Sequence, residues 1–160
     1  MKKSYKAGIS FGLVSGVLTT LGLLIGLGVS TQSKVAVIGG ILTIAIADAL
    51  SDSFGVHLPQ ESSGDNTQRQ VWEATFATFF SKFFFALTFL IPILIFNISL
   101  ALIVSVIWGL ILISVLSLLI STGEDGNRSG KLPVLAEHLS LFLLIVVLSY
   151  LVGFLIEKYI

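Results

Sequence analysis

Cysteine is absent from the 160-residue chain, and the first residue is its only methionine. The sequence therefore excludes disulfide bonds, thiolate-bound metals and cysteine nucleophiles, and it offers no thioether ligand within the apolar segments. Charge is also scarce, because Asp, Glu, Lys and Arg make up 11% of the residues and balance to a net charge of zero. No basic patch indicates nucleic-acid binding. Any bound metal would have to use oxygen or imidazole ligands.

Hydrophobic residues, by contrast, make up 55% of the chain, above the roughly 45–50% of an ordinary soluble domain. They are gathered in runs of about 20 residues, the length needed to cross a bilayer. We predict an all-α integral membrane protein that forms a single transmembrane domain in the lipid bilayer. Its expected spans are 8–29, 35–54, 74–96, 98–121 and 133–156, with a cytoplasmic loop at 57–70.

The distribution of basic residues predicts the orientation of these spans. Six of them fall on one side of the predicted membrane: Lys2, Lys3, Lys6, Arg69, Arg128 and Lys131. Only Lys34 and Lys158 fall on the other side. Because cytoplasmic connections are enriched in Lys and Arg, the N-terminus is expected in the cytoplasm. Five spans then place the C-terminus outside.

Two carboxylates four residues apart, Asp48 and Asp52, interrupt the second predicted span and share one face of a helix. An aspartate at the centre of a span costs about 2.5–3.5 kcal/mol on insertion scales, so such residues usually face a partner, a cavity or an ion path. The carboxylates either bind a cation or reach water at the end of the span. Lys82, the only basic residue within a predicted span, either reaches the membrane surface or pairs with one of them.

The first predicted span carries Gly8, Gly12 and Gly16 at four-residue intervals. This pattern indicates close packing, against another helix of the chain or against a second copy. Hydroxyl side chains nearby either line an ion path or bond to carbonyls of their own helix. The candidate path residues are Ser15, Thr19, Thr20, Ser51 and Lys82. The candidate metal ligands are Asp48 and Asp52, with Glu61, Glu73, Glu137 and His138 for a cytoplasmic capture site.

Several segments resemble the vacuolar iron transporter family. The segment 16–27 resembles its first helix, and Ala47-Asp48-Ala49-Leu50-Ser51, followed by Gly55, Leu58 and Glu61, resembles its second-helix signature. The segments 90–94 and 150–153, with Glu137, extend the resemblance over nearly the whole chain. It implies a homodimer of five-helix subunits that moves Fe²⁺ and Mn²⁺ out of the cytoplasm in exchange for protons. It implies no permanent cofactor.

The chain departs from the family at functional positions. Ser15 stands where the family has an aspartate, Asp52 where it has a methionine, and His57 where an aromatic residue often follows the glycine. The long cytoplasmic metal-binding domain of the plant-type members is missing. Exchanging a thioether for a carboxylate favours harder ions such as Mn²⁺, Mg²⁺, Ca²⁺ and Fe²⁺.

We therefore expect a divalent-cation transporter, with Fe²⁺ or Mn²⁺ as the transported ion, in a prokaryotic plasma membrane. The alternative is a non-transporting scaffold or assembly protein that keeps the transporter fold. An enzyme is not expected: two aspartates can form an acid–base dyad, but Asp48 and Asp52 fall on one predicted helix with no partner motif.

Overall fold

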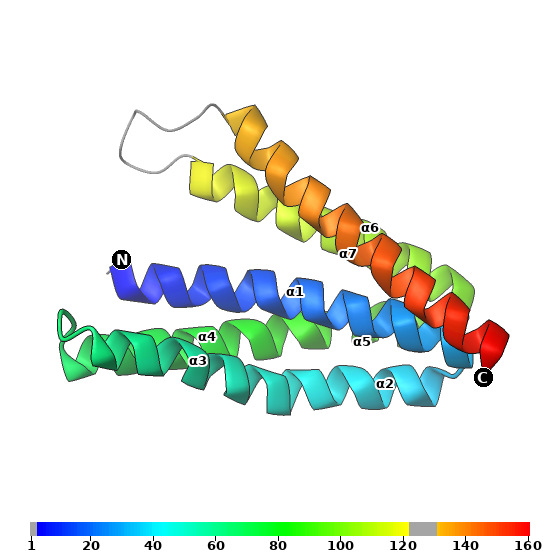
Figure 1. Ribbon diagram of the computed structural model, residues 1–160, viewed down its shortest axis with the longest axis horizontal. Helices are drawn as coiled ribbons and strands as arrows, with labels where there is room; N and C mark the ends of the chain where they lie inside the picture. Colours follow the sequence, from blue (N-terminus) through cyan, green and yellow to red (C-terminus); the bar gives the residue numbers. More distant parts are fainter. Residues whose placement is uncertain (1–2, 122–130) are drawn as a thin grey trace. The chain divides into compact units, whose positions relative to one another are not determined.

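The computed structural model describes residues 3–121 and 131–160, and every element in these ranges is a helix (Figure 1). The elements are α1 (Lys3–Thr31), α2 (Lys34–Thr43), the π-helical turn η1 (Ile44–Asp48), α3 (Ala49–Ser62), α4 (Gln68–Thr88), α5 (Leu90–Ile95), α6 (Ile98–Ser121) and α7 (Lys131–Tyr159). Five helical stretches are long and apolar enough to cross a membrane. The prediction of an all-α protein with five such helices is confirmed for the described residues.

The second of these stretches is longer than predicted. Residues 57–62 continue α3, so the connection to α4 covers only residues 63–67 instead of the predicted loop at 57–70. Pro59 lies inside α3, where it removes one backbone hydrogen bond without ending the helix. The polar composition of this segment therefore marks the end of an apolar run and not the end of the helix.

A capping box starts α4. The Thr67 hydroxyl accepts a hydrogen bond from the backbone N–H of Gln70, and the Gln70 side chain accepts one from the backbone N–H of Thr67. Such reciprocal bonds satisfy two of the unpaired N–H groups at a helix start. Gly64, with φ of +69°, supplies the left-handed residue of the turn before it.

The third stretch is interrupted shortly before Pro92. A proline has no N–H to donate to the carbonyl four residues earlier, which here is that of Thr88, the last residue of α4. Phe89 instead donates its N–H to the Ala86 carbonyl at 3.2 Å, a tighter turn, and α5 begins at the next residue.

The described chain divides into two compact units. The first unit comprises Met1–Thr20 and Ile38–Ile91, and the second comprises Leu21–Val37 and Pro92–Ile160. In the first unit, the N-terminal part of α1 and the turn η1 with α3 pack against α4. In the second unit, α6 packs against α7.

The glycine stripe of α1 packs against α4 of the same chain, which resolves one alternative left open by the sequence. A Cβ atom at Gly8 would lie 2.5 Å from the Ala74 carbonyl oxygen, and one at Gly12 would overlap the Thr78 carbonyl oxygen. At Gly16 a Cβ would lie 3.0 Å from the carbonyl oxygen of Lys82. The constant offset between these pairs means that α1 and α4 run parallel.

The parallel arrangement brings the starts of α1 and α4, with Lys6 and Arg69, to one end of the first unit. The side of a membrane that this end faces stays a prediction. Lys2 and Arg128 lie outside the described residues.

Candidate functional site

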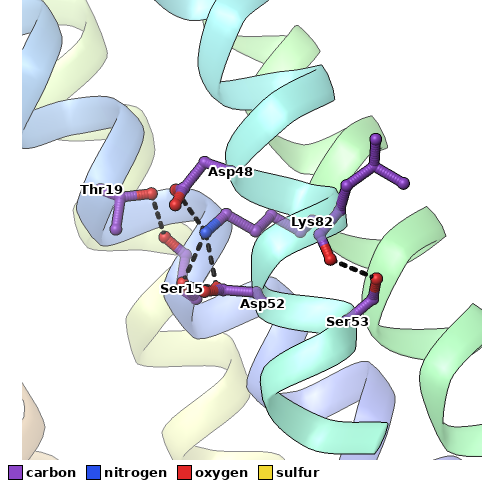
Figure 2. A network of polar contacts seen from close by, with 7 residues as sticks. Ser15, Thr19, Asp48, Asp52, Ser53 and Lys82 are labelled. Carbon is purple, nitrogen blue, oxygen red and sulfur yellow. Dashed lines mark hydrogen bonds and ion pairs between the residues drawn. The ribbon is translucent and has the colours of Figure 1, made fainter.

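Lys82 and the two aspartates of the predicted site form one polar cluster in the first unit (Figure 2). The Lys82 Nζ atom lies 2.5 Å from Oδ2 of Asp48 and 2.6 Å from Oδ2 of Asp52. The pairing of Lys82 with these aspartates is therefore confirmed, and it involves both carboxylates. Two negative charges and one positive charge leave the cluster with a formal charge of −1.

Ser15 completes the cluster from α1. Its hydroxyl donates to Oδ2 of Asp52 at 2.5 Å and accepts a hydrogen bond from Lys82 Nζ at 2.9 Å. An ammonium group has three N–H donors, and here each of the three has an oxygen partner: Asp48, Asp52 and Ser15. The Lys82 ammonium is thus fully bonded, and it joins α1, the second stretch and α4 within the first unit.

The local backbone explains how Lys82 reaches the other two helices. The absence of a side chain at Gly16 lets α4 approach α1 closely, since a Cβ there would lie 3.1 Å from the Cα atom of Lys82 and 3.3 Å from its Cγ atom. The stem of Lys82 therefore runs along α1, and its ammonium group ends beside Ser15, one residue before Gly16.

The two carboxylates come from a helix whose backbone changes form between them. Asp48 is the last residue of the π-helical turn η1, in which the backbone N–H of Ala49 bonds to the carbonyl of Ile44, five residues earlier. Asp52 lies in the first turn of α3. Single π-helical turns inside longer helices occur frequently at functional sites. The periodicity of the sequence gave no sign of this turn.

Exposure differs sharply within the cluster. The Lys82 side chain is 0% exposed, whereas 37% of the Asp48 side chain and 23% of the Asp52 side chain are exposed. The two carboxylates are therefore partly exposed, while the ammonium group is covered.

The other predicted path residues have different roles. The Thr19 hydroxyl donates to the Ser15 carbonyl oxygen at 2.7 Å, so it bonds within its own helix. Thr20 is completely buried, and its hydroxyl has no hydrogen-bond partner among the described residues. Ser51 is exposed. Of the hydroxyl residues proposed for the path, only Ser15 joins the charged cluster.

The residues predicted for a capture site are distributed over both units. Glu61 lies 3.7 Å from the Nε2 atom of His57, and Glu73 pairs with Arg69 at 2.8 Å. In the second unit, Glu137 is exposed and His138 bonds through Nδ1 to the Ser117 hydroxyl at 2.7 Å. Within residues 3–121 and 131–160, no three His, Asp or Glu side chains gather closely enough to hold a metal ion by themselves.

The sequence did not predict a functional role for His57. This residue is buried against α4, and its Nδ1 atom lies 2.9 Å from the Thr75 hydroxyl. The sequence does contain a sign of the contact of His57 with Glu61: His57 stands four residues before Glu61, a spacing that places both side chains on one helix face.

No known protein family, curated protein or solved structure matches this chain.

Proposed function

We propose that this protein transports divalent cations across a membrane and that Asp48 and Asp52 bind the transported ion. One observation carries the proposal: two carboxylates from a membrane-length apolar helix converge on a single point, which the Lys82 ammonium group now occupies at 2.5 and 2.6 Å. Charged residues in such helices usually mark ion paths or paired sites. The position of Nζ is the position that a transported cation would take.

The donor atoms of the cluster select the class of ion. Two carboxylates and the hydroxyl of Ser15 are oxygen ligands, which suit Mn²⁺, Mg²⁺, Ca²⁺ and Fe²⁺. Once Lys82 has moved away, the carboxylates carry a charge of −2, which one divalent cation neutralises. Fe²⁺ and Mn²⁺ remain the proposed ions on the strength of the resemblance to the vacuolar iron transporter family.

Lys82 acts in this proposal as a resident cation that keeps the empty site occupied. Leaving two carboxylates unpaired in an apolar environment costs several kcal/mol. The ammonium group removes that cost when no ion is bound, and the arriving ion must displace it. The greater exposure of the carboxylates supports this order, since an ion contacts Asp48 and Asp52 before it reaches Lys82.

The proposal also specifies the direction of transport, the counter-ion and the oligomeric state. A cytoplasmic N-terminus is proposed from the basic residues at the predicted cytoplasmic side, among them Lys6 and Arg69. Export from the cytoplasm is proposed from the family resemblance. Proton exchange follows from the competition of protons and metal ions for the same ligand atoms. A homodimer in a prokaryotic plasma membrane is proposed from the family resemblance alone, because the N-terminal glycine stripe of α1 is used within the chain.

The decisive experiment measures Mn²⁺ and Fe²⁺ flux into vesicles that contain the purified protein. Asp48→Asn should abolish flux, because it removes one of the two charges that bind the ion. Asp65→Asn is the matched control, since Asp65 is exposed in the short connection between α3 and α4, and flux should be unchanged. Both variants should retain helical content and a cooperative thermal transition. Normal flux in a folded Asp48→Asn variant would refute the proposal.

A second candidate function is a membrane scaffold that does not transport ions. The full bonding of the Lys82 ammonium favours it, because a satisfied cluster that joins three helices can serve stability alone. Metal ions separate the two candidates, since a ligand that binds only the folded state raises the apparent stability in a concentration-dependent way. Transport predicts such a rise with Mn²⁺, and a scaffold predicts none.

A further inference from the structure

His57 occupies a structured environment at the C-terminal part of α3, separate from the cluster around Lys82. Its ring packs edge-on against Trp72 with 4.7 Å between ring centroids, and Phe54 lies on another side at 6.4 Å. Only 8% of the residue is exposed. The ring is therefore fixed in orientation, and its two nitrogen atoms have different surroundings.

The Thr75 hydroxyl determines which ring nitrogen carries the proton. This hydroxyl donates its single hydrogen to the Val71 carbonyl oxygen at 2.8 Å, so in its 2.9 Å contact with His57 it accepts. Nδ1 of His57 must then be the N–H donor. In the neutral ring the lone pair lies on Nε2. Metal-binding histidines show this arrangement, with the second nitrogen donating to a neighbouring oxygen.

The Nε2 atom faces Glu61 at a distance typical of two ligands on one ion. The separation of 3.7 Å between Nε2 and Oε2 is too long for a hydrogen bond. Two ligands at about 2.1 Å from a tetrahedral ion lie roughly 3.4 Å apart. A small shift of the half-exposed Glu61 side chain would bring both atoms to bonding distance of one metal ion.

Gln60 offers a third donor on the same face of α3. His57, Gln60 and Glu61 follow the spacing of three and four residues that places side chains together on a helix. The Gln60 Oε1 atom is buried and has no hydrogen-bond partner among the described residues. Its backbone carbonyl accepts hydrogen bonds from Ser63 and Asn66, which hold the following turn against this end of the helix. A buried amide oxygen without a partner is costly unless a ligand satisfies it.

We propose that Nε2 of His57, the Glu61 carboxylate and the Gln60 amide oxygen bind a divalent first-row metal ion. One imidazole with two oxygen ligands suits ions such as Zn²⁺, Ni²⁺ and Co²⁺ better than Mg²⁺ or Ca²⁺. The site does not depend on the proposed transport function, because none of its three ligands belongs to the Lys82 cluster. Thr75 is a positioning residue that holds the imidazole with Nε2 toward Glu61.

The test is a calorimetric titration of the purified full-length protein with Zn²⁺ alone, in detergent. His57→Gln and Glu61→Gln should each weaken binding by about tenfold or more, because loss of even an outer hydrogen-bond partner of a ligand costs about 10–100-fold. His138→Gln is the matched control, as the other histidine of the chain, and should bind like the wild type. Asp48→Asn should also retain this binding, whatever it does to flux.

Thr75 provides a second, independent measurement. Thr75→Val should weaken Zn²⁺ binding, and Thr75→Ser should retain it because the hydroxyl is kept. If His57→Gln does not fold, Glu61→Gln decides, since half of that side chain is exposed. Zn²⁺ affinity unchanged in a folded Glu61→Gln or His57→Gln variant would overturn the site. Zn²⁺ binding in a protein that shows no Mn²⁺ flux would instead contradict transport and leave this site supported.

Discussion

Replacing Lys82 by methionine tests whether Lys82 occupies the ion site until a cation displaces it or serves only to stabilise the fold. The substitution keeps a long apolar stem in the buried space between α1 and α4 and removes only the ammonium group. The formal charge of the cluster changes from −1 to −2. Both Asp48 and Asp52 lose their cationic partner, and the Ser15 hydroxyl loses a donor.

Without metal, Lys82→Met should lower the free energy of unfolding by about 2–3 kcal/mol. Removing one member of a buried ion pair costs about 3–5 kcal/mol, but the two carboxylates are 37% and 23% exposed, so water recovers part of that cost. Binding of a divalent cation should change in the opposite direction. Hydrogen bonds to charged groups contribute about 1.5–3 kcal/mol, so an ion that no longer displaces Lys82 should bind roughly 10–100-fold more tightly.

Thermal unfolding in detergent over a series of Mn²⁺ concentrations measures both effects. A ligand at about 100 times its dissociation constant adds roughly 2.7 kcal/mol of apparent stability. Mn²⁺ should therefore restore most of the free energy of unfolding that Lys82→Met removes. Lys158→Met is the matched control, because Lys158 lies in the last turn of α7, where its ammonium group lies over the rings of Phe154 and Tyr159. A folded Lys82→Met variant whose stability Mn²⁺ raises no more than that of the wild type would refute the resident-cation reasoning.

Three further substitutions test the packing of α1 on α4 and the role of the Ser15 hydroxyl. Gly12→Ala should lower the free energy of unfolding by about 1–3 kcal/mol, because its Cβ would overlap the Thr78 carbonyl oxygen; Gly39→Ala, with open space around it, should instead stabilise by up to about 1 kcal/mol. Thermal unfolding of Gly12→Ala and Gly39→Ala measures these two changes in stability. Equal changes would contradict the packing of α1 on α4. Ser15→Ala should cost about 1–3 kcal/mol by leaving one N–H of Lys82 unpaired, and metal titration should show a smaller loss of affinity than Asp48→Asn. An unchanged melting temperature in Ser15→Ala would show that this hydrogen bond contributes little.

The helical stretches could be predicted because length and apolar composition determine them directly. The predicted span 98–121 covers α6, and 8–29, 35–54 and 133–156 lie within observed helical stretches. The span 74–96 runs through the break at Phe89 between α4 and α5 and ends one residue beyond α5. The ends were less predictable where a helix continues beyond its apolar run, as α3 does through Pro59 to Ser62. Apolar composition reports the part of a helix that can lie in hydrocarbon, and a helix can extend further into water with polar residues.

The sequence restricted the carboxylates that could pair with Lys82 but did not show whether one or both of them do so. Charge is scarce within the apolar runs, and Asp48 and Asp52 are two of the few carboxylates there, so an ion pair with Lys82 was an expectation from the sequence. The choice between one carboxylate and both depends on how η1 and α3, which carry the aspartates, pack against α4. The glycine pattern predicted close packing, but it did not identify α4 as the neighbouring helix.

The π-helical turn interrupts the helical periodicity of the second stretch directly before α3, which carries Asp52. An extra residue in one turn rotates everything before it by about 100° relative to a regular helix, since each residue of an α-helix turns the chain by that angle. A face followed back from Asp52 through η1 into α2 therefore does not continue as one stripe. The turn ends at Asp48, so the change of backbone form and the first carboxylate coincide. A regular helix at Ile44–Asp48 would alter the approach of Asp48 to Lys82, and the backbone, as much as the choice of residues, positions the two carboxylates around one cation.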